Sequence, residues 1–354
     1  NGPVASLIDT HKYGDVVIGN SNPINESGAA NQTGIRGYSD TGSVLIGNSG
    51  AITEVSTAGD AIGIYGYAAH GTTTINNEGA ITATSSTGLA DGIFAYGDIT
   101  NVINSGALTV TGGTWAAGIE AQAAGSVTVD NTGTIQSTAS SASGALGYGI
   151  YATGNDATVT NSGAITVRGY YATGIFTRTY GDTSITNNGA INAGTTSGSV
   201  LSWGINASAG GIGAAVTVDN NAAITAAGVY GAIGIQASSA GTGGTVNVDN
   251  SGTILITQNL ATTGYGAYGI LTSADGDATV YNSGNITANS KGKVFGIADM
   301  SFAGDADVTN TGNIVVSSTL NNTSNGATGI LAFSANGGAS VYNEGVSKAT
   351  GVRL

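Results

Sequence analysis

The chain has 354 residues, of which 60 are glycine, 2 are proline and none is cysteine. Its 21 acidic and 8 basic residues give a net charge of −13, which argues against nucleic acid and anionic membrane surfaces as partners, because both need a basic face. The lack of cysteine excludes disulfides and thiolate metal sites. No apolar run approaches the roughly 18 residues of a membrane helix, so we expect no membrane insertion by this chain.

One asparagine anchors a repeat of about 29 residues along the chain. A β-branched residue stands two positions before it, and an "xGxI" step follows it. A Gly-Ile pair completes the unit, as in Gly118–Ile135, "GIEAQAAGSVTVDNTGTI". The anchors are Asn20, Asn48, Asn77, Asn104, Asn131, Asn161, Asn187, Asn220, Asn250, Asn282, Asn310 and Asn343. Only the last copy lacks the aliphatic residue four positions after its anchor, where Ser347 stands.

Each repeat predicts three strands of about four to six residues. In "SVTVDN", Val127, Val129 and Asn131 share one face of the strand and Thr128 and Asp130 the other. A meander of hairpins would not keep three distinct strands in one order, so we expect each strand to pair with its equivalent one repeat later.

The predicted fold is therefore all-β, a right-handed parallel β-helix (a three-strand β-solenoid) of about 12 coils of ~29 residues. We expect a single domain over residues 1–354. It would have a partial coil at 1–19, repeats anchored at Asn20 through Asn343, and a terminal strand at 351–354.

The asparagine column predicts a structural ladder rather than a ligand site. Stacked side-chain amides can hydrogen-bond from coil to coil, and asparagine also tolerates left-handed backbone angles at a tight corner. The glycine two residues later, such as Gly133, is expected to supply a positive φ at the same corner.

Catalytic groups are sparse. The two histidines, His11 and His70, belong to no recognisable catalytic arrangement. Aspartates precede the asparagine strand in several repeats, which indicates a shared turn preference. Asp275, Asp277, Asp305 and Asp307 are weak candidates for a Ca²⁺ site, although their spacing matches no known calcium loop. We expect no enzyme activity and no cofactor.

Aromatic residues cluster around the Gly-Ile pairs. Tyr65, Phe94, Tyr151 and Phe176 directly follow the isoleucine, so strand alternation predicts that they point outward. An outward aromatic stripe can bind glycans by stacking or pack laterally against a neighbour. The alternative is that these rings only cover the corner loops.

The pattern "G-I-x-A … V-x-N-x-G-x-I", as in Gly149–Ile165, resembles the repeats of autotransporter passenger domains, the type V secretion proteins of Gram-negative bacteria. The resemblance covers essentially the whole chain and implies a β-helix displayed at the bacterial cell surface or released outside the cell. Members of that family include adhesins and aggregation factors. The repeats are scaffold, so they specify the architecture and only weakly the activity.

The chain begins and ends at the same phase of its repeat, with Leu7 and Ile8 near one end and Val352 and Leu354 at the other. Either flanking sequence is missing at these ends or copies stack head to tail. We predict head-to-tail stacking into a filament through these four residues. The expected function is that of a non-enzymatic, extracellular structural or adhesive surface protein. Its partners would be itself, by end stacking or lateral bundling, and glycans or host cell surfaces. The alternative function is a glycan-binding or polysaccharide-acting β-helix protein.

Overall fold

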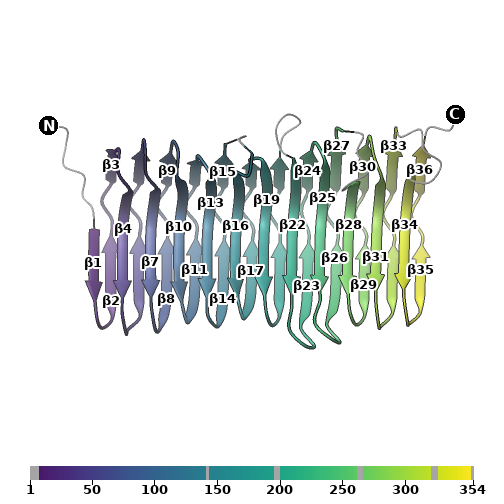
Figure 1. Ribbon diagram of the computed structural model, residues 1–354, viewed down its shortest axis with the longest axis horizontal. Helices are drawn as coiled ribbons and strands as arrows, with labels where there is room; N and C mark the ends of the chain where they lie inside the picture. The colour runs from purple at the N-terminus through teal and green to yellow at the C-terminus, as the bar shows by residue number, and fades with distance from the viewer. Residues whose placement is uncertain (1–7, 141–142, 195–199, 261–265, 320–325, 352–354) are drawn as a thin grey trace. The chain divides into compact units, whose positions relative to one another are not determined.

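The computed structural model describes residues 8–140, 143–194, 200–260, 266–319 and 326–351. All the regular secondary structure in these ranges is β-strand. Within them, no helix is long and apolar enough to cross a membrane. The chain divides into two compact units, residues 1–170 and 171–354, and each is built from three parallel sheets (Figure 1).

The three sheets, which we name A, B and C, hold the Gly-Ile strands, the asparagine strands and the "xGxI" strands respectively. In unit 1, sheet A contains β1 (Ile8–Lys12), β4 (Gln32–Ser39), β7 (Ala61–Ala68), β10 (Leu89–Gly97), β13 (Trp115–Ala123) and β16 (Leu146–Gly154). Sheet B contains β2 (Val16–Asn20), β5 (Val44–Asn48), β8 (Thr72–Asn77), β11 (Ile99–Asn104), β14 (Ser126–Asn131) and β17 (Asp156–Asn161). Sheet C contains β3 (Ile24–Gly28), β6 (Ile52–Ser56), β9 (Ile81–Ser85), β12 (Leu108–Gly112), β15 (Ile135–Ala139) and β18 (Ile165–Arg168).

Unit 2 repeats the same order. Its sheet A contains β19 (Tyr171–Thr179), β22 (Leu201–Ala209), β25 (Gly231–Ser239), β28 (Gly266–Ala274), β31 (Val294–Ser301) and β34 (Ala327–Ser334). Sheet B contains β20 (Thr183–Asn187), β23 (Ala215–Asn220), β26 (Thr245–Asn250), β29 (Ala278–Asn282), β32 (Ala306–Asn310) and β35 (Ala339–Asn343). Sheet C contains β21 (Ile191–Gly194), β24 (Ile224–Gly228), β27 (Ile254–Gln258), β30 (Ile286–Ser290), β33 (Ile314–Ser318) and β36 (Ser347–Gly351).

Equivalent residues of successive repeats are direct partners, so the predicted β-solenoid is confirmed. Val102 pairs with Val129 and Asn104 with Asn131, both in parallel register. Val129 and Asn131 are buried while the residue between them is exposed, which is the predicted alternation. Ser347, the one exception to the aliphatic pattern, still begins β36 and pairs with Ile314.

The strands of sheet A are longer than predicted. Apart from β1, they span eight or nine residues, for example Trp115–Ala123, rather than four to six. The glycine of the Gly-Ile pair lies inside the strand, and pairing continues on both sides of it.

Close packing explains why this position is glycine. A Cβ on Gly118 would lie 2.3 Å from Cγ2 of Ile135 and 2.7 Å from the carbonyl oxygen of Gly149. Real Cβ atoms do not come so close to other atoms, so the backbone at Gly118 has no room for a side chain. The aliphatic residue of sheet C fills the space where that side chain would stand.

The asparagines form the predicted amide ladder within each unit. The Nδ2 of Asn104 donates to Oδ1 of Asn131 at 2.8 Å and to the carbonyl oxygen of Gly106 at 2.9 Å. The first bond joins successive coils and the second closes the corner after the strand. Each amide therefore satisfies polar groups that are buried away from water.

The backbone angles expected at this corner were wrong. No non-glycine residue has a positive φ in the part of the chain that the structure describes, and the corner glycines do not have one either. Gly133 is required for a different reason, because a Cβ there would lie 2.1 Å from the carbonyl oxygen of Gly106 in the preceding coil. The corner needs space between coils rather than a left-handed backbone.

Candidate functional site

The four aromatic residues singled out in the sequence point outward from sheet A and are half-buried. Tyr65 and Phe94 are register partners, and their rings stack with centroids 4.9 Å apart at an interplanar angle of 8°. Glu120 separates Phe94 from Tyr151 in the same outward column. Phe176 belongs to unit 2 and pairs with Asn206. The structure joins Tyr65 and Phe94 into a continuous pair.

A second outward column lies beside the first. Tyr38, Tyr67 and Tyr96 occupy it in successive coils of unit 1. Tyr38 and Tyr67 stack at 4.9 Å, and Tyr67 and Tyr96 at 4.8 Å. The sequence prediction did not identify this column. Alternation would have found it, because a residue two positions after an outward residue also points outward.

We define the aromatic face as Tyr38, Tyr65, Tyr67, Phe94 and Tyr96. The rings within each column stack face to face, and another side chain lies over the ring at one end of each column. His11 meets Tyr38 edge-on at 4.5 Å, and the Arg36 guanidinium lies 5.8 Å from the centroid of the Tyr65 ring. Solvent therefore meets mainly ring edges and phenol groups. Burial raises the pKa of the Tyr65 phenol. A sugar that stacks needs a free ring face, so this geometry favours lateral packing over glycan stacking.

Two carboxyl groups lie next to the aromatic face, and the sequence prediction missed them as well. Asp91 is 2% exposed and accepts a hydrogen bond of 3.0 Å from Nε1 of Trp115. Glu120 is 9% exposed and accepts one from the Gln122 amide. Burial raises the pKa of both carboxyls, and the charge of Glu120 adds to the effect on Asp91.

A polysaccharide-acting site requires a pair of carboxyl groups, and Asp91 and Glu120 are one candidate pair. A catalytic acid must touch the bond that it protonates. Asp91 is closed to solvent, and its oxygen is already engaged by Trp115. The arrangement therefore holds Trp115 in place on the sheet, and Trp115 in turn contacts Tyr148 with ring centroids 4.8 Å apart.

The four calcium candidates act as hydrogen-bond acceptors that link neighbouring coils. Asp275 accepts from the amide of Gly243, Asp277 from the amide of Asp305, and Asp305 from the amide of Gly338. Asp307 accepts from the hydroxyl of Ser340. No group of three or more His, Asp or Glu residues that could hold a metal ion occurs within the described ranges. These contacts agree with the shared turn preference.

The residues predicted to stack end to end are mostly outside the described ranges. Leu7, Val352 and Leu354 fall there. Ile8 begins β1, is half-buried and pairs with Ile35. End stacking therefore stays a prediction.

Comparison of the chain with protein-family models, with curated proteins and with solved structures gave no match. The resemblance to autotransporter passengers therefore stays an expectation based on the repeat pattern.

Proposed function

We propose that the protein is a non-enzymatic structural and adhesive protein of the cell surface, and that copies of it associate laterally through the aromatic face of unit 1. The observation that carries the proposal is the pair of stacked columns on sheet A. The ring faces stack on one another within each column, and the ring edges stay accessible to a partner. Aromatic edges and phenol hydroxyls are typical of protein contact surfaces, where they combine apolar area with hydrogen bonds.

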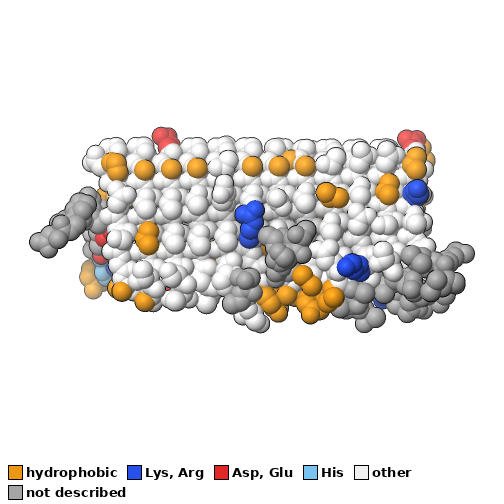
Figure 2. Space-filling model, turned by 90° about the horizontal axis from the view of Figure 1, so that it is seen from above, with side chains coloured by type: hydrophobic (Ala, Val, Ile, Leu, Met, Phe, Trp, Pro, Cys, Tyr) orange, Lys and Arg blue, Asp and Glu red, His pale blue; other side chains and the backbone are white. Residues whose placement is uncertain are grey.

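The low charge of the surface supports association between identical copies. Only 8% of the residues are charged, and charged side chains are sparse on the face drawn in Figure 2. Two copies with a net charge of −13 repel at long range, so the association should strengthen when salt screens that repulsion.

The test is analytical ultracentrifugation of the wild type and of a Tyr65→Ser/Phe94→Ser double variant at low and moderate salt. We expect the wild type to associate with rising concentration and the variant to stay monomeric. Tyr281→Ser is the matched control, because Tyr281 is 51% exposed on sheet B of unit 2. Circular dichroism checks that the variants keep their strands. A wild type that is monomeric throughout, or a double variant that associates as strongly as the wild type, would refute the proposal.

Negative-stain microscopy of the same samples separates side-by-side bundles from end-to-end filaments. Filaments that persist in the double variant would assign association to end stacking instead.

A further inference from the structure

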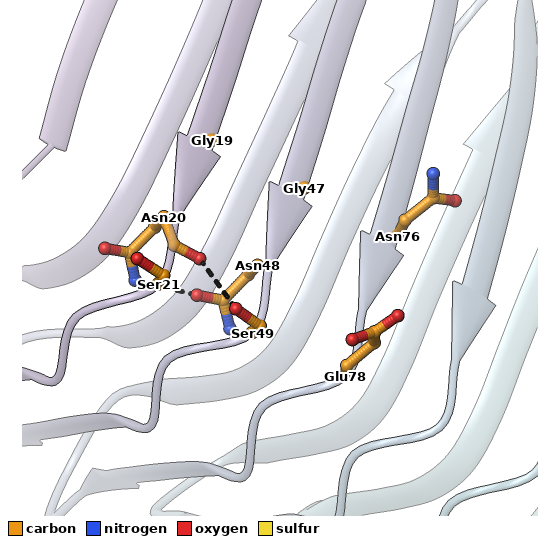
Figure 3. A pocket seen from close by; sticks show the side chains of 8 residues that line it. All are labelled: Gly19, Asn20, Ser21, Gly47, Asn48, Ser49, Asn76 and Glu78. Atoms are coloured by element: carbon orange, nitrogen blue, oxygen red, sulfur yellow. Dashed lines mark hydrogen bonds between the residues drawn. The ribbon is translucent and has the colours of Figure 1, made fainter.

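A shallow groove of about 370 Å³ lies on unit 1, where sheet B turns toward sheet C. Gly19 and Gly47 form its floor, Ser21 and Ser49 line the side after the strands, and Asn76 and Glu78 stand at the next coil (Figure 3). The groove lies on a different sheet from the aromatic face, because it is built on β2, β5 and β8 of sheet B rather than on the strands of sheet A.

The groove exists because two coils lack a side chain at one outward position. Gly19, Gly47 and Asn76 are register partners, and the column continues through Ile103 and Asp130. Every later coil of unit 1 carries a side chain at this position, so the groove ends at the Asn76 side chain.

The fold does not require these two glycines. A Cβ on Gly19 would meet nothing within 4 Å, and a Cβ on Gly47 would meet only the carbonyl oxygen of Ile18 at 4.0 Å. Both have room that Gly118 lacks. Glycine inside a strand costs roughly 0.5–1 kcal/mol relative to alanine. Where packing gives no reason for it, glycine in a strand often marks a bulge, a tight bend, or a place where a ligand or another backbone approaches closely.

The lining of the groove indicates the chemistry of its occupant. Val17 and Leu45 lie two residues before the glycines and are 71% and 42% exposed, so an apolar strip borders the floor. The Asn76 amide and the Glu78 carboxylate make no side-chain hydrogen bond to any other described residue and point away from the strands (Figure 3). None of the eight lining residues is a lysine or arginine, which disfavours an anionic ligand.

We propose that this groove binds a neutral pyranose unit of a glycan. The apolar C–H face of the sugar lies over the glycine backbone beside Val17 and Leu45. Its hydroxyls donate to the Glu78 carboxylate and exchange hydrogen bonds with Asn76, Ser21 and Ser49. The site adds a glycan-binding function on sheet B to the lateral association proposed for sheet A, and neither depends on the other.

The test is saturation-transfer NMR of the full chain with four neutral disaccharides: maltose, cellobiose, lactose and N,N′-diacetylchitobiose. We expect transfer to at least one of them in the wild type. The Gly19→Thr/Gly47→Thr double variant fills the groove and should reduce binding at least tenfold while its melting temperature stays equal or rises. Glu78→Gln should weaken binding without changing the melting temperature.

Two controls keep the test specific. Ile103→Thr changes the same column beyond the groove and should bind as the wild type does. Tyr65→Ser/Phe94→Ser should also keep binding, so that failure of the lateral-association proposal is distinguishable from failure of this one. No transfer to any of the four sugars, or undiminished binding by the glycine double variant, would overturn the proposal. Loss of binding in the aromatic variant alone would overturn it too, because it would assign the sugar to sheet A.

Discussion

Replacing Glu54 should stabilise unit 1 at pH 8. Glu54 lies on β6, points into the core and is 0% exposed. Neither of its carboxyl oxygens has a hydrogen-bond partner among the described residues. Its register partner in the preceding coil is a second acid, Glu26. Burial, and then repulsion by Glu26, raises the pKa of Glu54 from 4.5 to about 8.

The direction of the effect follows from which state binds the proton. Below pH 4.5 the carboxyl of Glu54 is protonated in both the folded and the unfolded chain, so its ionisation costs nothing. Between pH 4.5 and about 8 the unfolded chain releases the proton while the folded chain keeps it. The free energy of unfolding therefore falls by about 1.4 kcal/mol per pH unit across this window, which amounts to about 5 kcal/mol in all.

Glu54→Gln cannot ionise, so it should remove this pH dependence. A buried amide without full hydrogen bonding costs about 1–3 kcal/mol, so we expect a net gain of about 2–4 kcal/mol at pH 8 and little or no gain at pH 4. Glu54→Val tests the same point without the amide, because Val110 occupies the equivalent inward position of β12.

The assay is hydrogen exchange of peptides from β3 and β6 at several values between pH 5 and pH 8, corrected for intrinsic exchange. The protection of these peptides against exchange should decrease as the pH rises in the wild type and should stay constant in Glu54→Gln. The exposed Glu78→Gln variant should behave as the wild type does. The reasoning is refuted if the wild type and Glu54→Gln lose protection in parallel across this window.

Two further predictions concern stability, and chemical denaturation checks both. Asn131→Ala removes the bonds of Asn131 with Asn104, Asn161 and Gly133 and should cost about 3 kcal/mol. Thr128→Ala on the outward side of the same strand should cost less than about 0.5 kcal/mol, and equal losses in the two would contradict the ladder. Gly118→Ala should cost about 1–3 kcal/mol through overpacking against Ile135. Gly19→Ala, where a Cβ meets nothing, should instead stabilise by about 0.5–1 kcal/mol. A loss at Gly19 would contradict the steric argument.

The repeat alone was sufficient to predict the architecture. A β-branched residue two positions before each asparagine and an aliphatic residue four positions after it can be buried together only if equivalent strands stack. Outward orientation was equally predictable, since period-two alternation places Tyr65 and Thr128 on the outside whatever their neighbours are. These rules are local, so they can be applied to a single coil.

Distances between coils were not predictable from the sequence. Glycine in a corner suggests a special backbone angle, yet Gly133 and Gly118 are needed because neighbouring atoms leave no room for a Cβ. The sequence likewise could not show that Asp91 meets Trp115, or that Gly19 and Gly47 open a groove.

Each of these contacts joins residues at least 17 positions apart. It depends on the register and spacing of whole coils rather than on any local preference. The sequence by itself determined which residues face inward and which strands stack. Only the tertiary structure decided which outward residues touch one another and where the surface is left open.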